Sequence, residues 1–215
     1  LTDSSVILRS PYSPVSGITM YKTFSISKNI LFVSTRITND ADYDVAWGIW
    51  SNARFDINTL FFVPDVNDSS LWFTFDSAGK QSRVAHSLEN QNFSFIIPDD
   101  SIKGSSDFMT KAYMYSNTGH IVAANTGQML VMTFNPAKPE KIHPTHGLIE
   151  VYIETSTDGR NNLLELEHHS EYKKLKPGES LVYDQKWLLF PVEGNSELPD
   201  LIESYNQLKH KLNER

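Results

Sequence analysis

Short segments in which apolar and polar residues alternate recur along most of the chain, and this alternation limits its possible folds more than any other feature. Residues 30–38 (ILFVSTRIT) are the clearest example, between Asn29 and the turn-forming residues 39–42. Successive side chains of a β-strand point to opposite faces, so a period of two is typical of a strand with one buried face. The other segments that we predict to be strands are 45–50, 71–75, 93–97, 121–124, 129–134, 148–154, 162–167 and 181–190.

Turn-forming residues separate the predicted strands, as at 117–119 (NTG) and 176–179 (KPGE). Glycine, proline and asparagine adopt the backbone conformations that tight turns require. No stretch with a helical period lies between one predicted strand and the next, which favours an antiparallel sheet over a parallel one. Because 215 residues fit one large β domain, the sequence predicts an all-β antiparallel sandwich.

The C-terminal residues show a different period. An apolar stripe at helical spacing consists of Leu198, Leu201, Ile202, Tyr205, Leu208 and Leu212. Such a stripe is typical of a helix that packs one face against a core. We therefore predict a sandwich domain over residues 1–195 and a helix packed on it over residues 196–215.

Charge and composition exclude several classes of partner. The formal net charge is -7, and charges of both signs are dispersed, so contact with a nucleic-acid backbone is not expected. The chain has no cysteine, which excludes disulfides and thiolate metal sites. No apolar run reaches the roughly 18 residues that a membrane span needs. The sequence leaves the oligomeric state open, and it leaves a periplasmic, secreted or cytoplasmic location open too.

Residues 163–172 (LLELEHHSEY) carry the most chemistry. In a strand, Glu165, Glu167 and His169 would share one face. The other face would carry Leu164, Leu166 and His168. With the leucines directed into a core, both carboxylates would lie on the opposite face. That face is either a solvated surface or the wall of a ligand cleft, and the residues alone do not decide between the two.

The order of motifs around this segment resembles a known family. A Leu-Glu strand end, then residues 175–180 (LKPGES), then a strand with Trp187 are similar to the C-terminal part of galactose mutarotases. Upstream, residues 8–11 (LRSP), 17–26 and 48–52 resemble further passages of the same family. The likeness is strongest to an uncharacterised bacterial branch of this aldose 1-epimerase-like superfamily. It implies a β-supersandwich, and it implies that the N-terminal third of the family domain is missing from the chain.

The resemblance also implies roles for particular residues. Glu167 matches the general base that removes the proton of the sugar's anomeric hydroxyl, with Glu165 as the alternative if the register differs by two. The family's acid, a histidine on the middle strand, has no counterpart in residues 48–54 (GIWSNAR). Opening a pyranose ring requires both a base and an acid. Arg54 is a poor substitute because its pKa keeps it protonated.

Four other residues are candidates for contact with a sugar or sugar acid. Trp50 and Trp72 could stack on the apolar face of a sugar ring, although both could equally be core aromatics. Arg54 could bind a carboxylate through two hydrogen bonds, or form a surface ion pair. Lys111 stands where the uncharacterised branch tends to have a lysine before a strand.

Histidines are numerous, but their spacing does not predict a metal site. His143 and His146 are three residues apart, and Pro144 between them argues against a helix that would present both rings together. His168 and His169 are neighbours and would point to opposite faces of a strand. The HExxH motif is absent. We therefore predict neither a metal ion nor another cofactor.

Three functions are compatible with these observations. The first is a carbohydrate-binding protein that uses Trp50, Arg54, Lys111 and Glu167 around a cleft. The second is an aldose epimerase or a related sugar-modifying enzyme, with Glu167 as its base. The third is a structural or assembly module with a vestigial cleft. The sequence leaves open whether the protein is an enzyme.

Overall fold

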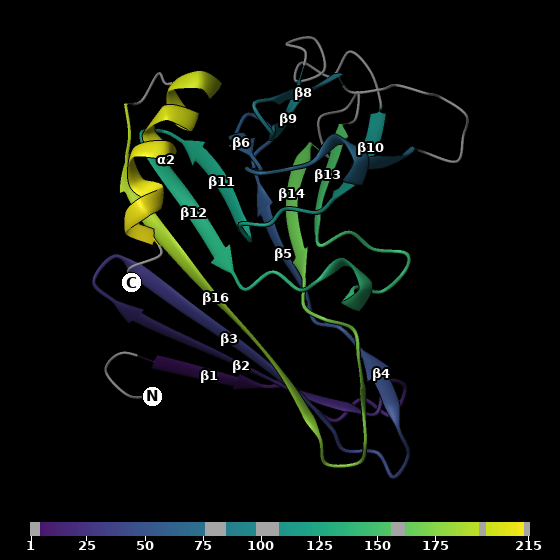
Figure 1. The fold of residues 1–215 in the computed structure, drawn as a ribbon. Helices are drawn as coiled ribbons and strands as arrows, with labels where there is room; N and C mark the ends of the chain where they lie inside the picture. The colour runs from purple at the N-terminus through teal and green to yellow at the C-terminus, as the bar shows by residue number, and fades with distance from the viewer. Residues whose placement is uncertain (1–4, 76–84, 98–107, 156–161, 194–196, 213–215) are drawn as a thin grey trace.

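Two antiparallel β-sheets face each other, and a C-terminal helix lies outside them (Figure 1). The computed structural model describes residues 5–75, 85–97, 108–155, 162–193 and 197–212. In chain order the strands are β1 (Ser5–Arg9), β2 (Ile18–Ser27), β3 (Ile30–Asn39), β4 (Val45–Trp47), β5 (Trp50–Phe55), β6 (Leu60–Phe62), β7 (Trp72–Phe75), β8 (Ala85–Glu89), β9 (Asn92–Ile96), β10 (Phe108–Met114), β11 (His120–Asn125), β12 (Gln128–Phe134), β13 (Ile149–Thr155), β14 (Leu163–His169), β15 (Lys173–Leu175) and β16 (Ser180–Pro191).

Within the described residues, the larger sheet has the order β1-β2-β3-β16-β12-β11-β6 and the smaller one the order β5-β14-β13-β10-β7. Strands β4 and β15 form a separate pair, and β8 and β9 form a hairpin. The long strand β16 shows why the pattern gives sheets. Its residues Leu181 and Tyr183 are buried, whereas Val182 between them and Asp184 after them are exposed. This alternation is the expected signature of a sheet with one covered face.

The main core lies between the two sheets. Its largest fully buried side chains include Phe93, Met114, Ile121, Ile149 and Leu166. Strand β14 departs from simple alternation, because six of its seven residues are buried. Both faces of β14 are therefore covered, one by the core and the other by polar side chains.

The helix α2 (Leu198–Leu212) packs on the outer face of β6, β11 and β12 (Figure 1). Leu201 and Tyr205 from its apolar stripe form a second core with Phe62 and Val122. The hydroxyl of Tyr205 is 2.7 Å from Nδ1 of His120 on β11. Residues 194–196 and 213–215, which include the predicted start and end of the helix, lie outside the described residues.

The structure confirms the predicted fold class: an antiparallel β-sandwich with a C-terminal helix. The division at residue 195 stays a prediction. The predicted strand 45–50 is wrong, because β4 pairs with β15 and β5 pairs with β14, in different sheets. Between them the backbone of Gly48 passes close to that of Glu171, and the N–H of Ile49 donates to Ser170 Oγ at 2.8 Å. These contacts direct the chain from one sheet to the other.

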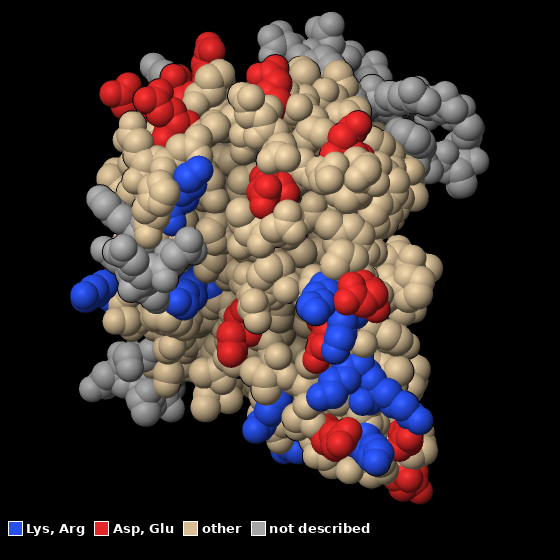
Figure 2. Space-filling view, in the orientation of Figure 1, with Lys and Arg blue, Asp and Glu red and all other residues tan. Residues whose placement is uncertain are grey.

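The surface carries charges of both signs. On the face shown in Figure 2, Lys and Arg are interspersed with Asp and Glu, and uncharged residues cover most of the area. This face shows no extended area of positive charge of the kind that binds a nucleic-acid backbone. Among the described residues, no helix is long and apolar enough to cross a membrane.

Candidate functional site

The candidate site is the polar face of the smaller sheet, centred on β14. Strand β14 lies between β5 and β13, and the register places Glu167 beside Asn52 on β5 and Glu150 on β13. Two residues along β14 on either side of Glu167, Glu165 lies beside Arg54 and His169 lies beside Trp50. Because side chains two residues apart share a face, these residues all lie on the side opposite the leucines of β14.

Glu167 is completely buried on this face. Its Oε2 accepts a hydrogen bond from Trp50 Nε1 at 2.8 Å and another from Lys111 Nζ at 2.8 Å. Trp50 itself is 56% exposed, so its indole forms part of the lid between this carboxylate and solvent. Burial raises the pKa of Glu167 to about 7, although the hydrogen bonds from Lys111 and Trp50 act in the opposite direction.

Lys111 on β10 connects two buried carboxylates. Its Nζ is 2.8 Å from Glu167 Oε2 and 2.6 Å from Glu150 Oε2. Burial alone would lower the pKa of Lys111, but the hydrogen bonds to the two carboxylates outweigh it and raise the pKa. The lysine is therefore held as a cation between two groups that repel each other.

Glu150 is paired on its other oxygen as well. Its Oε1 lies 2.8 Å from His146 Nδ1, 3.1 Å from the backbone nitrogen of Gly147 and 3.2 Å from His169 Nε2. Burial would raise the pKa of this carboxyl, but His169 and Lys111 outweigh that effect and hold the pKa well below its usual range. Glu150 is therefore ionised at neutral pH.

Besides Glu150 Oε2, which forms an ion pair with Lys111, two buried oxygens on this face have no hydrogen-bond partner among the described residues. They are Oε1 of Glu167 and Oδ1 of Asn52 on the neighbouring strand. Buried polar atoms in native proteins are nearly always hydrogen-bonded, to protein, water or ligand. These two acceptors lie on adjacent strands and lack a donor. A hydroxyl or an amine from outside the chain would therefore bind favourably beside them.

The other predicted site residues surround this centre. Arg54 Nε is 2.7 Å from Glu165 Oε1, and the Arg54 side chain is 73% exposed while that of Glu165 is 10% exposed. Trp72 stacks on Tyr113 with ring centroids 5.2 Å apart, and Lys111 Nζ lies 5.6 Å from the centroid of Tyr113. Trp72 thus connects to Lys111 through Tyr113 and stands at the edge strand β7.

The structure decides between alternatives that the sequence left open. The carboxylate face of β14 is not a solvated surface, because Glu165 and Glu167 are both buried. Neither Trp50 nor Trp72 is a core aromatic, since each is more than a third exposed. Trp50, Lys111 and Glu167 come into direct contact. The functional roles assigned to these residues stay predictions.

Sequence reasoning placed His169 on the same face as Glu167, but it missed Glu150 and His146 as members of the cluster. Glu150 could have been found, because the alternation of β13 puts it on the face opposite Ile149. His146 could not, since it precedes β13 in a loop whose path no period describes. The prediction of no metal site considered each histidine pair along the chain, whereas His146 and His169 meet across two strands.

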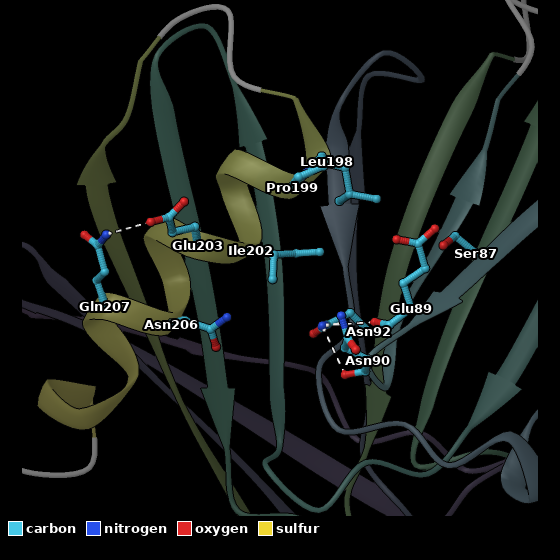
Figure 3. A pocket seen from close by; sticks show the side chains of 10 residues that line it. All are labelled: Ser87, Glu89, Asn90, Asn92, Leu198, Pro199, Ile202, Glu203, Asn206 and Gln207. Atoms are coloured by element: carbon cyan, nitrogen blue, oxygen red, sulfur yellow. Dashed lines mark hydrogen bonds between the residues drawn. The ribbon is translucent and has the colours of Figure 1, made fainter.

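A separate groove of about 460 Å³ lies between α2 and the β8–β9 hairpin (Figure 3). Leu198 and Ile202 form its apolar side on the helix, and Asn90 and Asn92 project from the hairpin. None of the predicted site residues lines this groove. The groove and the polar face of β14 are distinct features.

Comparison with known proteins places the chain in a family. A family model described as a domain of unknown function, DUF4380, matches residues 1–190. The chain belongs to the DUF4380 family. No functionally curated protein matches the sequence.

Solved structures show what fold this DUF4380 chain shares. A candidate aldose 1-epimerase from Klebsiella pneumoniae subsp. pneumoniae MGH 78578 superposes with a TM-score of 0.58 at 13% identity, covering 95% of this chain and 53% of that one. A candidate aldose 1-epimerase from Escherichia coli K12 gives 0.56 at 14%, covering 89% and 67%. A GalM/aldose epimerase homologue from C. elegans gives 0.56 at 12%, covering 90% and 67%.

These values show the galactose mutarotase-like fold that the sequence predicts, and the match to a domain of unknown function agrees with an uncharacterised branch. At 12–14% identity the likeness shows the fold alone. The chain spans about half of the Klebsiella protein and about two thirds of the other two. The activity and ligands of those whole proteins therefore do not transfer to this chain by similarity.

Proposed function

We propose that this protein binds a small carbohydrate or sugar acid on the polar face of β14. The observation that carries the proposal is the state of the Glu167 carboxylate. One oxygen is held by Trp50 and Lys111, while the other, Oε1, is buried and has no partner among the described residues. A carboxylate oxygen accepts hydrogen bonds, and a sugar hydroxyl is a donor of the right size and chemistry.

Trp50 suits the same ligand. Sugar rings present C–H groups on their faces, and exposed indoles commonly bind them. The indole of Trp50 donates to Oε2 of Glu167, so a sugar ring stacked on this indole would lie next to the carboxylate.

The cations on this face favour an acidic sugar. Lys111 contacts the Glu167 carboxylate, and the exposed guanidinium of Arg54 lies two residues further along β5 than Asn52, the neighbour of Glu167. A guanidinium binds a carboxylate through two parallel hydrogen bonds. A hexuronic acid could therefore place its ring at Trp50 and its carboxylate at Arg54.

An aldose epimerase is the second candidate, and the same unpartnered Oε1 favours it. Glu167 would remove the proton from the anomeric hydroxyl, as the resemblance implies. The ring oxygen also needs an acid, and the donors that contact Glu167 are ill suited to supply one. Trp50 does not release its proton near neutral pH, and the pKa of Lys111 is raised above its usual value. Binding without turnover is therefore the stronger proposal.

The test is a calorimetric titration with aldohexoses and hexuronic acids, paired with thermal shift. We expect a hexuronic acid to bind the wild-type protein, and Trp50→Ala and Glu167→Gln each to weaken binding at least tenfold. Trp47→Ala is the matched control, because Trp47 is similarly exposed but donates its indole N–H to Ser16. Polarimetry on the same sugars separates the two candidates: exchange of anomers that Glu167→Gln abolishes would establish the epimerase.

Absence of binding across the panel at millimolar sugar would overturn both candidates and favour an assembly module. Equal losses in Trp50→Ala and Trp47→Ala would show that the ligand binds elsewhere than at Glu167.

A further inference from the structure

We propose that His146, Glu150 and His169 bind a divalent first-row metal ion of the zinc type. Their ligand atoms lie within 4.8 Å of one another, and they come from the loop before β13, from β13 itself and from the end of β14. Two imidazoles and a carboxylate are donors that zinc and its neighbours prefer. The inference does not depend on the proposed sugar ligand.

The spacing fits a metal ion. His146 Nδ1 and His169 Nε2 lie 2.8 Å and 3.2 Å from Glu150 Oε1. Ligands at about 2.0–2.1 Å from a tetrahedral zinc ion are roughly 3.3 Å apart from each other. The two distances to Glu150 Oε1 are therefore each within about 0.5 Å of this value, and the two ring nitrogens, which lie within 4.8 Å of each other, would move together around the ion.

Hydrogen bonds within the chain satisfy only part of the cluster. Glu150 Oε1 already accepts from His146 Nδ1 and from the backbone N–H of Gly147, which engages both of its lone pairs. His169 Nε2 is buried 3.2 Å from the same oxygen, and within the described part of the chain it makes no hydrogen bond of good geometry. A buried ring nitrogen aimed at an occupied oxygen is costly unless a third group lies between them. A metal ion would satisfy both imidazoles and the carboxylate together.

The surroundings have the features of a built site. Lys111 bonds the second oxygen of Glu150, and partners of this kind hold metal-ligating carboxylates in orientation. Gly147 allows the loop to approach the sheet, because a Cβ there would lie 2.7 Å from the carbonyl oxygen of Ile149. The His146 side chain is 42% exposed, so an ion can enter from solvent.

Three protein ligands leave one tetrahedral position open. In zinc proteins this arrangement is typical of sites that bind a water molecule or a ligand oxygen, in contrast to closed structural sites with four protein ligands. We therefore expect the fourth ligand to be water in the isolated protein.

The experiment is a titration of chelator-treated, dialysed protein with Zn²⁺ alone, followed by calorimetry, with Co²⁺ as a spectroscopic probe. We expect one equivalent of Zn²⁺ to bind with micromolar or tighter affinity. His146→Ala and His169→Ala should each weaken binding about 100-fold or more, since even an indirect partner of a ligand contributes 10–100-fold. His210→Ala, which removes an exposed histidine from α2, should leave the affinity unchanged.

A second measurement uses the wild-type protein and requires no substitution. On addition of Zn²⁺, the ring nitrogens of His146 and His169 should shift in long-range ¹H–¹⁵N spectra, while those of His210 should not. Weak binding above about 100 μM, loss of affinity equal in His210→Ala and His169→Ala, or ring shifts confined to other histidines would each overturn the metal site. In that outcome the cluster is an ion pair between Glu150 and protonated imidazole.

Discussion

Replacing Lys111 by methionine should destabilise the protein strongly. The lysine lies between Glu150 and Glu167, whose side chains are each 1% exposed, and its Nζ is within 2.8 Å of both carboxylates. Methionine has a similar length but no charge, so both carboxylates would lose the cation that they share. Removing one partner from a buried ion pair costs about 3–5 kcal/mol, because the remaining charge stays desolvated. For a domain of this size that corresponds to a fall in Tm of about 6–20 °C.

Urea denaturation followed by circular dichroism measures this change directly. The matched control is Lys174→Met, because Lys174 pairs with Asp44 at 2.8 Å while both side chains are more than a third exposed. Exposed pairs contribute about 0–1 kcal/mol, so this variant should remain close to wild type. Adding Glu167→Gln to Lys111→Met should recover part of the loss, since it removes one of the two carboxylates. Equal stability of the two lysine variants would refute the claim that Lys111 offsets buried negative charge.

Three further predictions concern stability. Burial lowers the pKa of His120 to about 4, so in acid the unfolded state binds a proton before the folded state does, and stability should fall by up to about 3 kcal/mol as pH drops from 7 to 4. Urea midpoints of wild type and His120→Gln across this range should converge at low pH, and parallel curves would contradict the prediction. Gly147→Ala should cost about 1–3 kcal/mol in chemical denaturation, because its Cβ would clash with backbone atoms. Gly48→Ala, whose nearest contact is 3.5 Å, should stay within about 1 kcal/mol. Leu201→Ala should cost about 2–5 kcal/mol by opening the second core, and a smaller loss would mean that α2 packs loosely.

The fold follows from local signals, which explains why it could be predicted. Strand β16 alternates buried and exposed residues over its first half, and a period of two in the sequence is sufficient to recognise it. The stripe of α2 is equally local. The break between β4 and β5 has no such signal, because Gly48 and Ile49 are fixed by contacts to Ser170 and Glu171, more than 100 residues further along the chain.

The candidate site could be predicted only in part, for a related reason. The period of β14 correctly places Glu165, Glu167 and His169 on one face, but it does not say whether that face meets water. Its burial results from Trp50 and Lys111, which approach from two other strands. Residues contributed by separate strands meet according to register and strand order, and neither is encoded in the pattern of one segment.

Lys111 joins the two proposed sites. Glu150 Oε1 would bind the metal and Glu167 Oε1 would accept the sugar hydroxyl, while Lys111 bonds the second oxygen of each carboxylate. A metal ion on Glu150 would reduce the negative charge that attracts Lys111 there and strengthen its hold on Glu167. Such coupling is reciprocal, so a ligand at Glu167 must change metal affinity by the same factor. A substitution of Lys111 should therefore alter both affinities, whereas one of Arg54, which pairs with Glu165 at the exposed rim, should alter sugar binding alone.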